Sequence, residues 1–292
     1  SIMKIESTLS CIFILLFANS IYGYNKENSC EKLIQNGNNL EAVDAAKKIK
    51  NQYDKHFCLG KAYYRSNMHE LAIKAFSDSE EGAELPADQM FSILYKGIAE
   101  RDSGSINISS KTFTRGLETA KLGNSKYLQM ERKFLYQLGQ NALSTNEYDE
   151  SIDFFSKSIV ISVNNDERAE GLDRLSLAYY GKKKLDKAIE YALKASNMYL
   201  KTGDLNNYAD KQLNMATYHL ENNAPDRSLR LLEKLEQFAK DNGSQYYEAK
   251  ALLEQSLVFK SKGDEQNAIA RFNIGFDIAK SIGAKDLLLP KK

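Results

Sequence analysis

The chain has 292 residues, of which 27% are charged and only 3 are proline, and its formal net charge at pH 7 is +1. A balance so close to neutrality supplies no bulk electrostatic attraction for nucleic acid or anionic lipid, so neither partner is expected. Leu, Ala, Lys and Glu recur throughout, and the mean hydropathy is −0.50. This composition favours long amphipathic helices and an all-α fold.

The N-terminal segment has the pattern of a secretory signal peptide. Lys4 precedes an apolar run from Cys11 to Ala18, and Ala18-Asn-Ser20 is a small-x-small cleavage site. The run is shorter than the roughly 20 apolar residues that a bilayer-spanning helix needs. We therefore expect residues 1–23 to be a signal peptide and residues 24–292 to be a periplasmic or secreted domain. The alternative is a buried N-terminal helix in a cytosolic protein.

Removal of a signal peptide leaves two cysteines, Cys30 and Cys58. A pair of cysteines in an oxidising compartment favours one disulfide between them. The alternative is two buried free thiols, since free cysteine behaves as a small apolar residue.

An internal repeat runs through the chain from residue 28 onwards. In its clearest copy Gly60 is followed by Tyr63, by Ala72 twelve residues later and by Phe76. The twelve-residue offset recurs in seven copies, and its second position, here called the small column, is always Ala or Ser. The small column consists of Ala42, Ala72, Ser109, Ser151, Ala188, Ser228 and Ala268. Small residues at this spacing predict two helices, A and B, that approach closely, with Phe76, Phe113, Phe155 and Phe272 filling the space behind them.

A third column lies between the two helices of each copy. Six of its seven members are Gly or Asn, the residues that tolerate a left-handed backbone and end helices. The column consists of Gly37, Asn67, Gly104, Asn146, Lys183, Asn223 and Gly263. Each copy therefore predicts helix A, a tight stop and helix B. The longest irregular connection is expected from Ser77 to Asp88, around Pro86.

These columns resemble the tetratricopeptide repeat family. Gly60, Tyr63, Ala72 and Phe76 match its small and aromatic positions, although the small column steps by 30 to 42 residues, so that it is similar to a long variant of about forty residues. The resemblance implies a right-handed α-solenoid of about seven antiparallel helix pairs. A degenerate first repeat would occupy residues 28–50, and six further repeats would occupy 53–284.

The resemblance also implies a partner-binding groove lined by the A helices. Tyr and Arg are common anchors of protein interfaces, and the implied groove positions are rich in both. The alternative is that the aromatic members pack against the neighbouring A helix instead. The implied groove residues are Tyr64, Phe91, Tyr95, Arg101, Lys133, Tyr136, Gln140, Arg174 and Tyr180, and Asp173, Asp210, Asn214 and Glu254 lie further along.

The sequence lacks the common catalytic and cofactor motifs. It has no P-loop, dinucleotide-binding glycine pattern, nucleophile elbow or HExxH sequence. Its three histidines, His56, His69 and His219, have no second ligand at metal-binding spacing. We therefore expect no enzyme activity, no metal, no cofactor and no small-molecule substrate.

Two functions fit the repeat. The first is a non-catalytic, secreted or periplasmic scaffold that binds a peptide segment or a partner protein in the groove. The second is the extracytoplasmic sensor module of a membrane signalling protein, such as a histidine kinase or a diguanylate cyclase. The second is favoured by the apolar stretch Leu287 to Leu289, which resembles the start of another element.

Overall fold

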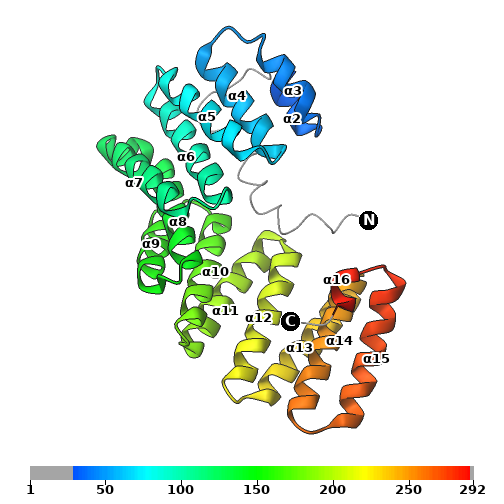
Figure 1. The fold of residues 1–292 in the computed structure, drawn as a ribbon. Coiled ribbons are helices and arrows are strands. Elements are labelled where there is room, and N and C mark those ends of the chain that lie inside the picture. The colour runs from blue at the N-terminus through cyan, green and yellow to red at the C-terminus, as the bar shows by residue number, and fades with distance from the viewer. Residues whose placement is uncertain (1–28, 290–292) are drawn as a thin grey trace. The chain divides into compact units, whose positions relative to one another are not determined.

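The computed structural model describes residues 29–289 and divides the chain into two compact units, Ser1–Ser105 and Ile106–Lys292 (Figure 1). The expected signal peptide, residues 1–23, lies outside the described residues. Between residues 29 and 289 every regular element is a helix, and no helix there is both long and apolar enough to cross a bilayer. The prediction of an all-α fold is confirmed for this part of the chain.

Between Ser29 and Ser105 the first unit contains five helices, each packed against the next in sequence. Their bounds are α2 Ser29–Gln35, α3 Asn39–Ala46, α4 Gln52–Arg65, α5 His69–Glu81 and α6 Pro86–Asp102. The helices α2 and α3 form the degenerate first pair, α4 and α5 form the second pair, and α6 is the A helix of the third pair.

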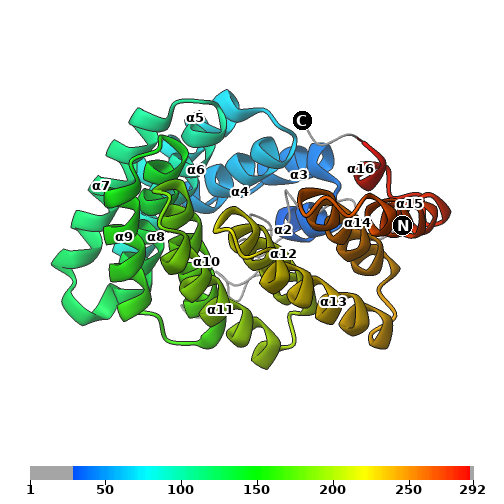
Figure 2. The same cartoon turned by 90° about the horizontal axis from the view of Figure 1, so that it is seen from below.

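The second unit begins with α7, which is helix B of the third copy of the repeat in sequence, and continues with four complete pairs. Its helices are α7 Ile106–Leu122, the short 3-10 helix η1 Asn124–Tyr127, α8 Leu128–Ser144, α9 Tyr148–Val160, α10 Asn165–Gly181, α11 Leu185–Thr202, α12 Leu205–Glu221, α13 Pro225–Asp241, α14 Gln245–Ser261, α15 Glu265–Ser281 and α16 Lys285–Leu288. Figure 2 shows the succession of α12, α13, α14 and α15 within this unit. Each consecutive pair packs on the next, as expected for stacked antiparallel helix pairs.

The predicted stop between helices A and B takes a left-handed backbone in every described copy. The φ angles range from +55° at Asn223 to +92° at Gly104, and Lys183 adopts +60° although it is neither Gly nor Asn. At each stop the next amide reaches back to the carbonyl five residues earlier, as in Met68 N to Tyr63 O at 2.9 Å. This bond is the Schellman closure, and it satisfies carbonyl groups that the end of a helix leaves unpaired.

The small column is buried throughout, from 0% exposure at Ala42 to 5% at Ala268. Opposite it the helix A backbone approaches an aromatic ring so closely that a Cβ at Gly139 would lie 2.8 Å from the ring of Phe155. The prediction that phenylalanines fill the space behind is confirmed for Phe76, Phe113 and Phe155, each 0% exposed. It is wrong for Phe272, which is 47% exposed because no long A helix follows α15 within the described residues.

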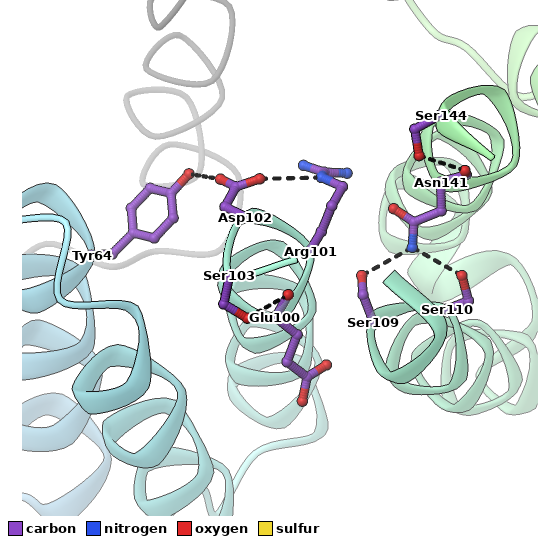
Figure 3. A network of polar contacts seen from close by, with 9 residues as sticks. All are labelled: Tyr64, Glu100, Arg101, Asp102, Ser103, Ser109, Ser110, Asn141 and Ser144. Carbon is purple, nitrogen blue, oxygen red and sulfur yellow. Dashed lines mark hydrogen bonds and ion pairs between the residues drawn. The ribbon is translucent and has the colours of Figure 1, made fainter. Parts of the chain in front are cut away.

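Serine in the small column needs a partner for its hydroxyl group, because burial removes water. Ser151 donates to the carbonyl oxygen of Gly139 at 3.0 Å, which joins helix B to helix A of the same pair. The buried side chain of Asn141 donates to Ser109 Oγ at 2.9 Å and to Ser110 Oγ at 3.0 Å, which joins α8 to α7 (Figure 3). These bonds replace the apolar contact that alanine makes elsewhere in the column.

The expected irregular connection from Ser77 to Asp88 is mostly helical, so this prediction is wrong. The helix α5 continues to Glu81, and α6 begins at Pro86. Proline is favoured in the first turn of a helix, because its fixed φ suits that position and its missing N–H has no partner there. Ser79, buried at the end of α5, hydrogen-bonds Ser92 of α6 at 2.8 Å and so fixes this short connection.

Two contacts fasten the degenerate first pair to the second. Cys30 of α2 and Cys58 of α4 form a disulfide with a Cα–Cα distance of 6.4 Å, so the two cysteines are not free thiols. Beside it Lys61 of α4 and Glu31 of α2 form an ion pair that is almost completely buried. Burial lowers the pKa of Lys61, while the Glu31 carboxylate opposes that shift. Because α2 has only seven residues, these contacts compensate for its small packing surface.

Reduction of the Cys30–Cys58 disulfide is expected to lower the melting temperature and to unfold α2 and α3 first. Closing a loop of this length stabilises by about 3 kcal/mol in the chain-entropy model. Thermal melting with and without reductant measures the effect, and hydrogen exchange locates it. The double variant Cys30→Ser, Cys58→Ser should be insensitive to reductant. Identical melting of the oxidised and reduced parent protein would contradict this account.

Candidate functional site

Two of the four implied groove residues in the first unit belong to its core. Phe91 and Tyr95 are 9% and 4% exposed. The ring of Tyr95 lies edge-on to Phe57 at 5.2 Å and near Phe76 at 5.6 Å. The expectation that Phe91 and Tyr95 are accessible to a partner is therefore wrong. Both rings fill the space between α6 and the preceding pair, as the alternative of packing against neighbouring helices states.

The other two implied residues of the first unit, Tyr64 and Arg101, are half-buried and lie near the C-terminal ends of their helices. The hydroxyl group of Tyr64 on α4 donates to Asp102 Oδ2 on α6 (Figure 3). Arg101 Nε donates to the other oxygen of the same carboxylate at 3.4 Å. Asp102 thus joins successive A helices and orients both side chains toward one edge of the unit.

In the second unit Tyr136 is also a packing residue, only 6% exposed. Its ring packs against Phe155 at 5.5 Å, and its hydroxyl oxygen accepts a bond from Arg174 Nε at 3.3 Å. The implied groove role of Tyr136 is wrong for the same physical reason as that of Tyr95. Lys133, Gln140, Arg174 and Tyr180 are half-buried and remain candidates for contact with a partner.

Tyr180 links α10 to α12. Its hydroxyl group donates to Glu221 Oε1 at 2.5 Å, and its ring stacks on Tyr218 with 4.6 Å between centroids. The aromatic pair closes the junction between these two A helices, because Tyr218 is only 3% exposed. Lys183 Nζ also lies over the Tyr180 ring, 5.0 Å from its centroid, so the half-buried ring contacts both an aromatic side chain and a cation.

Ion pairs connect successive A helices along the second unit, and we call this set the charge ladder. Arg132 of α8 lies 3.3 Å from Glu167 of α10, Lys211 of α12 pairs with Asp173 of α10, and Lys250 of α14 lies 3.4 Å from Asp210 of α12. The charge ladder consists of Arg132, Glu167, Asp173, Lys211, Asp210 and Lys250. The first two pairs are almost completely buried, and the third is partly exposed.

Burial perturbs two further charged groups beside the charge ladder. Burial raises the pKa of Glu170, although the nearby Arg132, Lys133 and Arg174 oppose that rise. Burial lowers the pKa of Lys133. Both side chains are half-buried, and charges at such positions interact more strongly with one another, and with a charged partner, than they do in bulk water.

The small and aromatic columns gave no indication of the charge ladder, but a search for opposite charges one repeat apart would have found it. Asp173 and Lys211 are 38 residues apart, and Asp210 and Lys250 are 40 apart. A second row of polar contacts, two ion pairs and one amide–carboxylate hydrogen bond, lies near the A–B turns at similar spacing. Its members are Lys182 with Asp149, Asn222 with Asp186 at 3.0 Å and Lys262 with Asp226 at 2.5 Å.

A hollow of about 250 Å³ opens between α12 and α14, with α13 behind them. Its walls are largely apolar, and Glu221 and Glu254 contribute a carboxylate each. The lining residues are Ala216, Thr217, Leu220, Glu221, Ser228, Leu232, Glu254, Leu257 and Val258. Within residues 29–289 no group of three or more His, Cys, Asp or Glu side chains could hold a metal ion. The arrangement is suited to recognising a side chain.

Comparison with known proteins identifies the fold. No family model and no curated protein matches this chain. Many solved structures are similar in fold, and three of them illustrate the similarity. A signal transduction ATPase with a tetratricopeptide repeat sensor, from Pyrococcus horikoshii, is 15% identical with a TM-score of 0.71 over 88% of this chain. The apo form of RapI is 14% identical, with a TM-score of 0.65 over 87% of this chain and 83% of its own. The C-terminal part of a TPR repeat-containing protein from Cytophaga hutchinsonii is 17% identical. Its TM-score is 0.63, over 89% of this chain and 98% of its own.

These similarities establish a tetratricopeptide-type α-solenoid, as the columns of the sequence predict. The chain spans 42% of the length of the Pyrococcus horikoshii protein. At identities this low the similarity concerns the fold, and the fold supports many unrelated functions.

The Lys211–Asp173 pair should be important for stability. Lys211→Met leaves the Asp173 carboxylate buried without its partner and is expected to cost about 3 to 5 kcal/mol. The double variant Lys211→Met, Asp173→Leu should recover most of the loss. The exposed pair Lys157–Asp153 on α9 supplies the control, because Lys157→Met should change the free energy of unfolding by about 0.5 kcal/mol or less. Urea unfolding measures all three variants, and equal losses for Lys211→Met and Lys157→Met would contradict the burial argument.

Proposed function

We propose that this chain is a non-catalytic scaffold that binds a peptide segment or a partner protein on the A-helix face of its second unit. The observation that carries the proposal is the set of half-buried charged side chains Lys133, Glu170 and Arg174 on α8 and α10, together with the largely apolar hollow between α12 and α14. Half-buried charges and an apolar hollow on the A helices of one unit offer both orientation and contact area to a polypeptide. The tetratricopeptide fold supports the same conclusion, because stacked A helices present a continuous surface.

We also propose that the scaffold works outside the cytoplasm, in the periplasm or as a secreted protein. The disulfide between Cys30 and Cys58 supports this placement, since structural disulfides persist in oxidising compartments. The pattern of residues 1–23 supports it independently. Fusion of residues 1–23 to a reporter enzyme that is active only after export tests the placement, and a reporter retained in the cytoplasm would refute it.

A second candidate function is the sensor module of a membrane signalling protein of the histidine kinase or diguanylate cyclase type. The exposure of Phe272 and Ile269 on α15 favours it, because these apolar side chains offer a surface on which another domain could pack. The similar protein from Pyrococcus horikoshii has a tetratricopeptide repeat sensor joined to other domains. This function also needs a ligand-binding face. The two candidates therefore differ mainly in whether the solenoid acts alone or is joined to a membrane signalling domain.

Crosslinking capture from the native extracytoplasmic fraction tests the scaffold. The variant Gln140→Arg, Asn214→Arg places two bulky cations on half-buried positions of helices α8 and α12. The matched control Asn197→Arg, Gln237→Arg places the same cations on exposed positions of the B helices α11 and α13. We expect a partner that the parent and the control capture and that the A-face variant loses. Circular dichroism verifies that all three proteins remain helical.

Other outcomes are equally informative. A partner retained by both variants would place the binding surface away from the A helices of the second unit. Capture of no partner by the parent protein would refute the free scaffold and favour the sensor module.

A further inference from the structure

The hollow between α12 and α14 lies where the preceding junction of the same unit is filled. Between α10 and α12 the ring of Tyr218 stacks on Tyr180 and is buried. The equivalent residues of the next junction, by repeat register, are Val258 and Leu220. The change from two tyrosines to valine and leucine removes two rings, and both smaller residues line the hollow. The space that is left corresponds in position to the aromatic side chains of the preceding junction.

The walls of the hollow suit the face of an aromatic ring. Leu220 of α12 and Leu257 of α14 line it from opposite helices, and Leu232 of α13 lines it from behind. Leu257 is 45% exposed, an unusual state for a leucine beside a buried junction. Covering such a side chain with a ring removes apolar surface from water and is favourable for binding.

The charged lining residues of the hollow are both acidic. Glu221 belongs to α12, where its Oε1 accepts from the Tyr180 hydroxyl group, and Glu254 belongs to α14, so an acidic residue lines the hollow from each helix. No basic residue lines the hollow. Glu254 is also among the groove positions that the tetratricopeptide resemblance implies. A segment carrying lysine or arginine next to its aromatic residue therefore complements the hollow in charge.

Ser228 adds a polar requirement. It lines the hollow from α13 and is 1% exposed, and its hydroxyl group has no hydrogen-bond partner within the described residues. The equivalent Ser151 donates to the Gly139 carbonyl oxygen. A buried hydroxyl without a partner is unfavourable, and a guest that supplies one gains a hydrogen bond. A ring that carries a hydroxyl group can supply that partner.

We propose that the hollow between α12 and α14 binds a tyrosine side chain of a partner polypeptide, with lysine or arginine beside that tyrosine. The inference rests on the proposed function, and it names the chemistry of the bound segment. The tyrosine ring contacts Leu220, Leu257 and Val258, and its hydroxyl group reaches Ser228. The adjacent cations pair with Glu221 and Glu254.

Fluorescence anisotropy with a labelled twelve-residue peptide tests the proposal. The probe carries one central tyrosine between two lysines in an otherwise alanine and serine sequence. Three matched peptides replace the tyrosine with alanine, the tyrosine with phenylalanine or both lysines with glutamate. We expect the tyrosine peptide to bind the parent protein. Compared with it, the alanine and glutamate peptides should bind at least about tenfold more weakly, and the phenylalanine peptide several-fold more weakly.

The matched protein variant is Val258→Tyr, which fills the hollow as Tyr218 fills the preceding junction. It should weaken the tyrosine peptide at least about tenfold while leaving the melting temperature unchanged or raised. Lys234→Ala, at an exposed position of α13, is the control and should bind like the parent protein. The double variant Glu221→Gln, Glu254→Gln should weaken the lysine-flanked peptide and reduce the salt dependence of its binding.

Unchanged affinity in Val258→Tyr, or equal affinity for the tyrosine and alanine peptides, would overturn the proposal. Equal affinity for the tyrosine and phenylalanine peptides would overturn the role of Ser228 and with it the choice of tyrosine. Failure here is distinct from failure of the scaffold. If the A-face variant loses a captured partner while Val258→Tyr keeps it, the scaffold stands and the hollow is not its anchor.

Discussion

In the pairs α4–α5 and α8–α9, helix A contributes a glycine where helix B contributes a buried phenylalanine ring. At Gly60 a Cβ would lie 2.5 Å from the ring of Phe76, and at Gly139 it would lie 2.8 Å from the ring of Phe155. Neither position has room for a larger residue unless the ring moves. The close approach fixes the distance between the helices, and the left-handed stop at the turn fixes their direction. Every surface described for the second unit depends on A helices held in this way.

These backbone constraints explain why much of the fold could be predicted from the sequence. A left-handed stop demands Gly or Asn at most positions, and a close approach of two helices demands Gly, Ala or Ser. Each constraint therefore restricts the residue type at a fixed position of every repeat, and this regularity is visible in the sequence. The sequence could not indicate that Phe272 is exposed, because Phe272 and Phe155 occupy the same position of the repeat and differ only in what packs behind them. It could not reveal the boundary between the two units either, since that boundary lies within the third pair.

The candidate site was harder to predict. Groove positions inferred from the resemblance placed Tyr95 and Tyr136 at a binding surface, yet both rings are buried between helices. Register along a helix gives the direction of a side chain, but it does not tell how near the neighbouring A helix lies. Charge pairs such as Asp173 with Lys211 could not be predicted from the repeat columns, because those columns contain no charged positions that face one another. The hollow depends on the absence of a ring at Val258, and such an absence is visible only when the two junctions are compared in three dimensions.

The charge ladder and the hollow have complementary physical roles in the second unit. Buried ion pairs are costly to desolvate and are retained where they specify one arrangement, so the charge ladder favours a single register between successive A helices. The two buried pairs join α8 to α10 and α10 to α12, and the partly exposed pair Lys250–Asp210 joins α12 to α14, the helices that carry Leu220 and Leu257. The packing defect at Val258 thereby becomes a persistent feature of the surface, which is the property that a preformed binding site requires.

The most direct test of this account is hydrogen–deuterium exchange on the variant Gly139→Val. Because each pair contacts only its neighbours, the account predicts faster exchange in α8 and α9, smaller changes in α7 and α10, and no change in α14 and α15. Lys157→Val, at an exposed position of α9, should leave all of these helices as protected as in the parent protein. Unchanged protection of α8 and α9 in Gly139→Val would show that the two helices do not approach closely at Gly139 and would contradict the account.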